Sequence, residues 1–190
     1  MVRAMSARLP LLSAALGLLV ACGPAPERFA APLAAPGGRI AVPVASIEIR
    51  EVSLPTYALD EEIWIETQAG ALTADAALLW ADEPSRGMTL ELARQLAAIT
   101  GARVAAEPWP FTGLPDGIVE VRADSFVAGA DGRFRISGQV FTEAVEAGRP
   151  RARDFAVSAA IPPDSGAPGI AAARAAAVRD LARLIARDGF

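Results

Sequence analysis

The sequence contains no histidine, no lysine and no asparagine, and Cys22 is its only cysteine. Without histidine or lysine, the chain cannot build a Ser-His-Asp triad, a Cys-His pair, a Schiff base or a P-loop. The same absences exclude His/Cys metal clusters, and a single thiol cannot close an intramolecular disulfide. Carboxylates, arginines, hydroxyl groups and one tyrosine, Tyr57, remain. These absences exclude most enzyme mechanisms, and we expect no enzyme activity, no cofactor and no metal.

All 18 positively charged side chains are arginines, which are set against 22 aspartates and glutamates for a net charge of −4. Loss of the first 21 residues would remove Arg3 and Arg8 but no acidic residue, and would bring the net charge to −6. The arginines are scattered and form no basic run that could displace counterions from phosphates. The sequence therefore predicts no nucleic-acid partner.

The first 21 residues have the organisation of an export signal. Two arginines precede an apolar run, Leu11 to Ala21, which is shorter than the ~20 apolar residues of a spanning helix. The run leads into Leu19-Val20-Ala21-Cys22-Gly23, which resembles the lipobox of bacterial lipoproteins. This resemblance implies that residues 1–21 are a signal peptide cut off before Cys22, and that Cys22 carries a diacylglycerol on its sulfur and an acyl group such as palmitate on its amine. The alternative is a buried helix with an incidental core cysteine, which the position at the very N-terminus disfavours.

Residues 22–42 are rich in proline, alanine and glycine and carry little charge. This composition is typical of an extended, flexible linker, and we expect a tether that spans about 60 Å at ~3.1 Å per residue. Gly23, rather than an acidic residue, follows Cys22. By resemblance to lipoprotein sorting in enteric bacteria, this implies an outer-membrane protein that faces the periplasm. Residues 43–190 are long enough for a single domain with its own core.

Hydrophobic periodicity predicts the elements of this domain. Alternation of apolar and polar residues indicates strands at 44–52, 61–67, 71–80, 103–107, 118–126, 133–142 and 154–161. Helical spacing indicates one helix that starts at Pro84 or Ser85 and is closed by Gly101, and a second over 170–186. Gly-Ala-Asp-Gly at 129–132 is a hairpin signal. The sum predicts an α+β fold: a mainly antiparallel β-sheet packed by two α-helices in a single domain.

With these elements in place, the sequence resembles the PqiC-like auxiliary lipoproteins of ABC-type transport systems. The shared features are the lipobox and tether, a strand that runs into Leu54-Pro55-Thr56-Tyr57, an isoleucine strand at 63–65, Leu79-Trp80-Ala81 with Glu83-Pro84, the amphipathic helix, a strand ending in Phe126, a hairpin and a terminal helix. The resemblance implies that residues 43–190 are an ABC-type transport auxiliary lipoprotein domain without catalytic activity. It also implies that the protein docks an MCE-domain protein and, through it, an inner-membrane permease and ATPase that move lipids between two membranes and maintain the barrier. Whether the chain forms a homo-oligomer stays open.

Three aromatic residues are candidate partner contacts, because Trp and Tyr dominate binding hot spots. Tyr57 follows Pro55 on an expected loop, Trp64 falls on the polar phase of its strand, and Trp109 lies between two prolines. Each has a packing alternative: a ring in the core for Tyr57, a sheet covered on both faces for Trp64, and a plug at one end of the core for Trp109. Trp80 is expected in the core.

We expect the acidic clusters and the arginines of the last helix to be solvated surface groups rather than sites. Residues 60–62 and 82–83 are acidic, but neighbouring strand residues point to opposite faces, so we expect a solvated turn and a charged helix start rather than paired carboxylates or a cation site. The arginines of the last helix are interleaved with Asp180 and Asp188, which indicates a solvated face, with contact to anionic headgroups as the alternative. These arginines are Arg174, Arg179, Arg183 and Arg187.

Two functions stay open at this point. The first is an interaction subunit anchored in the membrane, as the family resemblance implies. The second is a periplasmic carrier or chaperone that holds an acyl chain in a pocket between sheet and helices. The second requires an apolar cavity of roughly several hundred Å³, whereas a filled core with exposed aromatic side chains favours the first.

Overall fold

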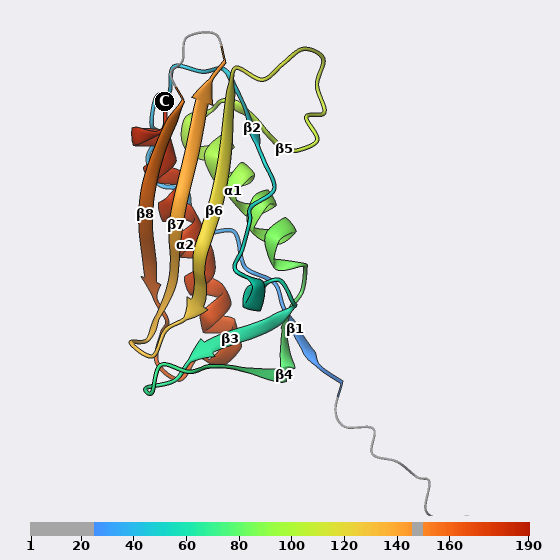
Figure 1. Cartoon of the computed structure of the whole chain (residues 1–190), viewed down its shortest axis with the longest axis vertical. Coiled ribbons are helices and arrows are strands. Elements are labelled where there is room, and N and C mark those ends of the chain that lie inside the picture. The colour runs from blue at the N-terminus through green and yellow to red at the C-terminus, as the bar shows by residue number, and fades with distance from the viewer. Residues whose placement is uncertain (1–24, 146–149) are drawn as a thin grey trace, which may run out of the picture.

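The computed structural model of the chain describes residues 25–145 and 150–190, which fold into eight strands, a 3-10 turn and two α-helices (Figure 1). The predicted signal peptide and Cys22 lie outside these residues. In chain order the elements are β1 (Glu27–Phe29), β2 (Ser46–Ile49), η1 (Thr56–Ala58), β3 (Glu62–Glu66), β4 (Leu72–Trp80), α1 (Pro84–Thr100), β5 (Arg103–Ala106), β6 (Gly117–Ala128), β7 (Arg133–Ala144), β8 (Arg151–Ala160) and α2 (Gly166–Asp188).

All eight strands belong to one sheet in the order β1-β4-β3-β6-β2-β5, with β7 and β8 added on β6. The long ladders β6–β7 and β7–β8 are antiparallel, as is β3–β4. The short pairings of β1 with β4 and of β2 with β5 and β6 are parallel. The predicted fold class, a mainly antiparallel sheet with two helices, is confirmed.

Strand β6 organises the sheet through its two edges. One edge pairs with β7 along its whole length. The other is divided, because β2 pairs with the first residues, Gly117 to Val119, and β3 meets only the last residue, Ala128. We call these two places the β2–β5 end and the β3–β4 end of the sheet. At ~3.3 Å per strand residue, the two ends of this 12-residue strand are about 35 Å apart.

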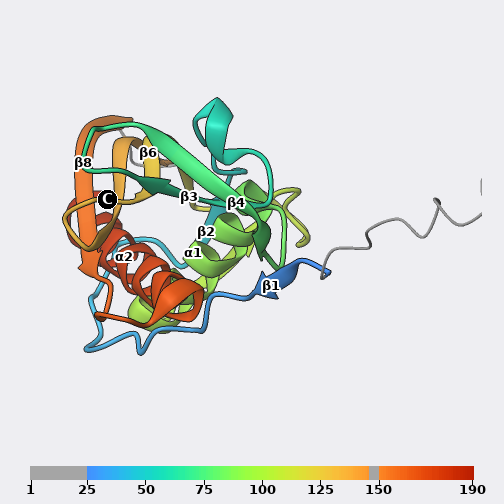
Figure 2. The same ribbon diagram turned by 90° about the horizontal axis from the view of Figure 1, so that it is seen from below.

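Both helices cover the same face of the sheet and contact each other (Figure 2). Helix α1 begins where Pro84 supplies a first residue that needs no hydrogen bond, and the Glu83 carboxylate accepts from the backbone N–H groups of Ser85 and Arg86. It ends at Gly101, whose φ of 73° is left-handed. Its predicted limits are confirmed, whereas α2 extends beyond the predicted 170–186 at both ends.

The core fills the space between this face and the helices. Trp80, Phe126 and Phe134 pack edge to face, with ring centroids 5.0–6.2 Å apart. Trp80 is buried, as predicted. The hairpin turn between β6 and β7 is also confirmed, because Gly129 donates its N–H to the carbonyl of Arg133 at 2.7 Å.

The expectation of a free tether over 22–42 needs correction for the part that the structure describes. Strand β1 pairs with the end of β4, and Gln95 donates to the carbonyl of Ala34 at 2.7 Å. Farther along, one guanidinium N–H of Arg183 is 3.1 Å from the carbonyls of both Pro36 and Gly38. The segment is extended, as its composition indicates, but α1, α2 and β4 bind its backbone. Composition did not reveal this, because each partner is more than 50 residues away in sequence.

Neither helix of the described residues is long and apolar enough to cross a membrane.

Candidate partner-contact site

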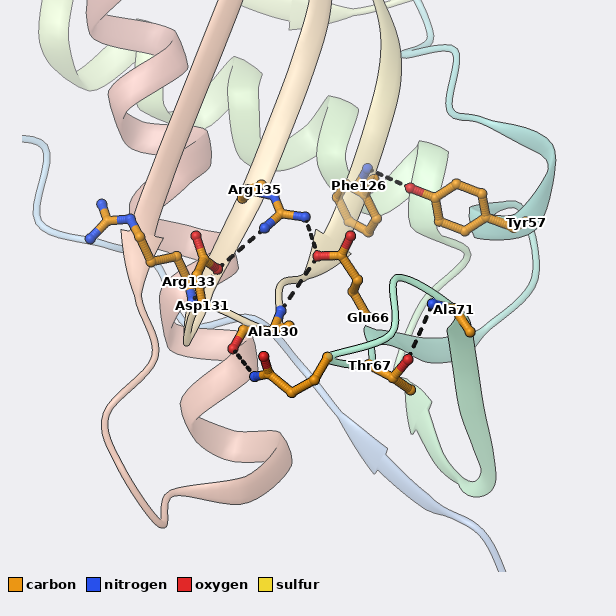
Figure 3. Close-up of polar contacts among 10 residues, drawn as sticks. Tyr57, Glu66, Thr67, Ala71, Phe126, Ala130, Asp131, Arg133 and Arg135 are labelled. Atoms are coloured by element: carbon orange, nitrogen blue, oxygen red, sulfur yellow. Dashed lines mark hydrogen bonds and ion pairs between the residues drawn. The ribbon is translucent and has the colours of Figure 1, made fainter.

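Tyr57 binds the edge of β6 between the places where β2 and β3 pair with it. Pro55 stops the chain after β2, and the next residues form the 3-10 turn η1. The turn places the Tyr57 hydroxyl 2.9 Å from the backbone N–H of Phe126, which donates to it (Figure 3). Tyr57 thus satisfies a β6 group near the β3–β4 end, and its hydroxyl serves the fold.

Trp64 lies against Tyr57. The two ring centroids are 5.9 Å apart with planes at 73°, so the rings meet edge to face. Trp64 is half-buried, and its buried indole N–H has no hydrogen-bond partner among the residues that the structure describes. The predicted alternation of β3 is wrong in part: Ile63 is buried, but Ile65, two residues nearer the turn between β3 and β4, is exposed.

Trp109 lies at the other end of the sheet, on the loop 107–116 between β5 and β6. Its ring meets that of Phe111 edge to face, with centroids 4.9 Å apart, and the Arg103 guanidinium is 5.0 Å from the Phe111 centroid. The structure therefore brings two of the three candidate residues together and leaves Trp109 apart from them.

A polar network around Glu66 joins the end of β3 to the β6–β7 turn (Figure 3). The Arg135 guanidinium pairs with the Glu66 carboxylate at 2.5 Å and with that of Asp131 at 3.3 Å. Glu66 also accepts from the N–H of Ala130. The hydrogen bond from Arg135 is the main reason why the pKa of Glu66 lies below its ordinary value of 4.5, and Glu66 in turn raises the pKa of Arg135. The network holds the β3–β4 hairpin in place.

The prediction of a solvated arginine face is wrong for Arg174. This side chain is 3 % exposed, pairs with Glu91 of α1 at 2.9 Å, and stacks over the rings of Trp80 and Phe126 at 4.6 and 5.3 Å. Burial raises the pKa of Glu91 and lowers that of Arg174. Arg174 Nε and Glu91 Oε2 are buried without a partner in the described residues. The pair joins the two helices to the core aromatics, and a helical charge pattern gave no signal for it.

Two other arginines of α2, Arg179 and Arg183, also contact other groups of the protein. Arg179 pairs with its neighbour Asp180 at 2.7 Å, and Arg183 binds the backbone of residues 36 and 38. The acidic residues behave as expected, since Glu83 caps α1 and Glu61 pairs with Arg28 at 2.6 Å.

Four surface hollows of the described residues have volumes of about 130 to 400 Å³. Each is lined by at least three charged side chains; the smallest, between β1 and α1, includes both members of the Arg174–Glu91 pair. An acyl chain requires an apolar lining. Each of these four linings mixes charged side chains with apolar ones, so none is apolar throughout.

Comparison with known proteins agrees with the resemblance predicted from the sequence. Residues 29–186 match the family described as ABC-type transport auxiliary lipoprotein component. No curated protein matches the chain. The fold is similar to that of an uncharacterized protein of known crystal structure, which is 19 % identical with a TM-score of 0.71 over 87 % of this chain and 99 % of that one. It is also similar to the crystal structure of a Xanthomonas campestris protein of the DUF330 family, 17 % identical with a TM-score of 0.61 over 85 % and 91 %. With most of its length inside the family match, the chain belongs to the family of ABC-type transport auxiliary lipoprotein components.

Proposed function

We propose that the protein is a non-catalytic subunit of an MCE/ABC-type intermembrane lipid transport system. In this proposal it is anchored in the outer membrane, faces the periplasm, docks the MCE-domain protein and supports envelope integrity. Membership of a family of transport auxiliary lipoproteins supports the connection with an ABC-type transporter.

The anchor in this proposal is Cys22, exposed as the first residue when the signal peptide 1–21 is removed. The lipobox-like sequence ahead of it supports lipidation. A diacylglycerol together with an amide-linked acyl chain provides the two hydrophobic groups that stable membrane attachment needs.

The observation that carries the docking role is the contrast between a filled interior and exposed apolar side chains. The large apolar side chains between sheet and helices are buried, and each of the four hollows described above includes charged side chains in its lining. At the surface, by contrast, apolar side chains such as Leu114 and Leu59 are exposed. This arrangement supports an interaction subunit over a carrier that encloses an acyl chain. Of the three predicted aromatic contacts, Trp109 is the one proposed for this partner, because the Tyr57 hydroxyl accepts from β6 and the Trp64 ring packs against that of Tyr57.

Co-purification tests this function. We expect the full-length protein, solubilised from envelopes in mild detergent, to bring down an MCE-domain protein together with a permease and an ATPase. Repeated failure to recover an MCE-domain protein from solubilised envelopes would contradict the docking role.

The matched variant for the anchor is Cys22→Ser. We expect it to lose incorporation of labelled palmitate and to leave the membrane fraction, because serine cannot be alkylated as the thiol is. Palmitate labelling and membrane retention at the level of the unsubstituted protein would show that the anchor lies elsewhere.

A further inference from the structure

The exposed large apolar side chains gather mainly at the two ends of the sheet. Phe111, Leu114 and Val145 belong to the β2–β5 end, where the N–H of Val145 donates to the carbonyl of Asp116 at 2.8 Å. Leu59, which directly follows η1, and Ile65 and Leu72, which lie in β3 and β4, belong to the β3–β4 end. Single exposed apolar residues are ordinary, but groups of them indicate contact surfaces. The two groups therefore need separate explanations.

The group at the β2–β5 end is centred on an uncharged loop held firmly at both bases. Residues 108–115 contain no charged side chain. At one base, the Glu107 carboxylate accepts from the N–H of Glu51 at 2.9 Å. At the other, the Asp116 carboxylate accepts from the N–H of Ala45 at 3.1 Å. Between these bases Leu114 is 82 % exposed and Phe111 42 %. The hydrogen bonds at the two bases and the contact between the Trp109 and Phe111 rings restrict the loop before it binds, which lowers the entropy that it loses on binding a partner.

The N-terminal segment determines which end lies nearer the membrane. Strand β1 is fixed to β4 at the β3–β4 end, and its carbonyl at Phe29 accepts from Ala81 at 3.0 Å. Only five residue steps separate Cys22 from Glu27, a reach of at most about 18 Å when fully extended. This step rests on the lipidation of Cys22 in the proposed function. A lipid at Cys22 then keeps the β3–β4 end close to the bilayer, whereas the loop 108–115 lies at the opposite end of the molecule (Figure 1).

We infer that residues 108–115, together with Arg103, form the docking surface for a protein partner on the side away from the membrane. Phe111 and Leu114 supply the apolar anchors, and Trp109 supports the Phe111 ring from the side. No carboxylate of the described residues pairs with Arg103, which stacks on Phe111 and leaves its guanidinium N–H groups for the partner. The matching surface is an apolar hollow with a carboxylate at its rim, because aromatic and arginine side chains pair with such sites at hot spots.

The test compares two double variants of the full-length chain in mild detergent. Phe111→Ser with Leu114→Ser changes the proposed surface, and Leu59→Ser with Leu72→Ser makes the same kind of change at the other end. All four side chains are exposed, so we expect both variants to unfold at the temperature of the unsubstituted protein. We expect the first to reduce recovery of the MCE-domain protein about tenfold or more, and the second to leave it within about twofold.

A photoreactive amino acid at position 114 provides a second measurement that does not require loss of function. We expect it to cross-link in intact cells to the same protein that co-purifies. Cross-linking to lipid at position 114, or full recovery of the partner by the Phe111/Leu114 variant, would overturn the inference but leave the proposed function intact. If the unsubstituted, palmitate-labelled protein recovers no MCE-domain protein at all, the proposed function fails and the inference fails with it.

Discussion

Two arginine–glutamate pairs hold different parts of this molecule, and their pKa values shift in opposite directions. Arg174 and Glu91 join the helices in the interior, with side chains 3 % and 9 % exposed. Arg135 and Glu66 join strands at the surface, with 34 % and 27 % exposed. The interior pair has a raised glutamate pKa and a lowered arginine pKa, whereas the surface pair has the reverse.

Solvation explains the difference. In the interior, desolvation of the carboxylate outweighs the attraction of Arg174. Within the described part of the chain, one buried polar atom of each side chain also lacks a hydrogen-bond partner. At the surface, water still solvates both groups, so the hydrogen bond from Arg135 decides the direction for Glu66. The same two residue types thus form an ion pair with a large desolvation penalty in the interior and a well-solvated ion pair at the surface.

The largest expected effect is that of Arg174→Ala. It leaves Glu91 buried without its partner and removes the guanidinium from the faces of Trp80 and Phe126. We expect the free energy of unfolding to fall by about 3–5 kcal/mol, measured by urea denaturation of the purified protein followed by tryptophan fluorescence.

The matched control is the double variant Arg174→Met with Glu91→Leu, which removes both charges and keeps apolar volume. We expect it to regain most of the lost stability, since a buried ion pair often gives way to apolar residues at little cost. A double variant as unstable as Arg174→Ala would contradict the view that the unpaired charge is what destabilises the single variant.

The pH dependence of stability separates the two glutamates more finely. The contribution of Glu66, whose pKa is lowered, is present above its ordinary value of 4.5 and is lost as the pH falls through its value in the folded protein. That of Glu91, whose pKa is raised, is present below 4.5 and is lost as the pH rises through its value in the folded protein. We therefore expect the difference in free energy of unfolding between each variant and the parent protein to change with pH in opposite directions for Glu66→Gln and Glu91→Gln. Equal slopes would show that environment does not distinguish the pairs.

The smallest expected effect is that of Arg135→Ala. Its partly exposed partners can be solvated by water once the guanidinium is gone, so we expect a loss of stability well below that of Arg174→Ala. Hydrogen exchange at Ala130 and in β3 is the sensitive measurement, because the Arg135–Glu66 pair stabilises these segments locally. A loss as large as that of Arg174→Ala would show that the surface network is part of the core.

Local patterns account for what the sequence could predict. The limits of α1 follow from Glu83, Pro84 and Gly101, and the hairpin at 129–132 from its glycines, because each signal lies next to the structure that it produces. The burial of Trp80 follows from the general tendency of tryptophan rings to pack in a core. Membership of the family was also evident from short motifs along the chain.

Contacts between distant segments account for what the sequence could not predict. Arg174 was interpreted as solvent-facing, because Glu91 is 83 residues away and a helical charge pattern does not show where a partner comes from. The pairing of β1 was hidden by a composition typical of linkers. Of the three candidate aromatic residues, the contact of Tyr57 with Trp64 and the separation of Trp109 from both depend on how η1, β3 and the loop 107–116 fold around β6.

The three-residue pairing of β1 has a mechanical consequence. If the chain is held by its N-terminus, any tension between membrane and partner enters the body at Glu27, which β1 attaches to β4 through three residue pairs and the bridge from Arg28 to Glu61. A pull along the strand loads these bonds together in shear, whereas a sideways pull opens them one after another. Release of β1 would free the chain up to its next hydrogen bond, at Ala34, and lengthen the linker by seven residues, or about 23–25 Å. The protein would then yield under load in a small step while its core stays folded.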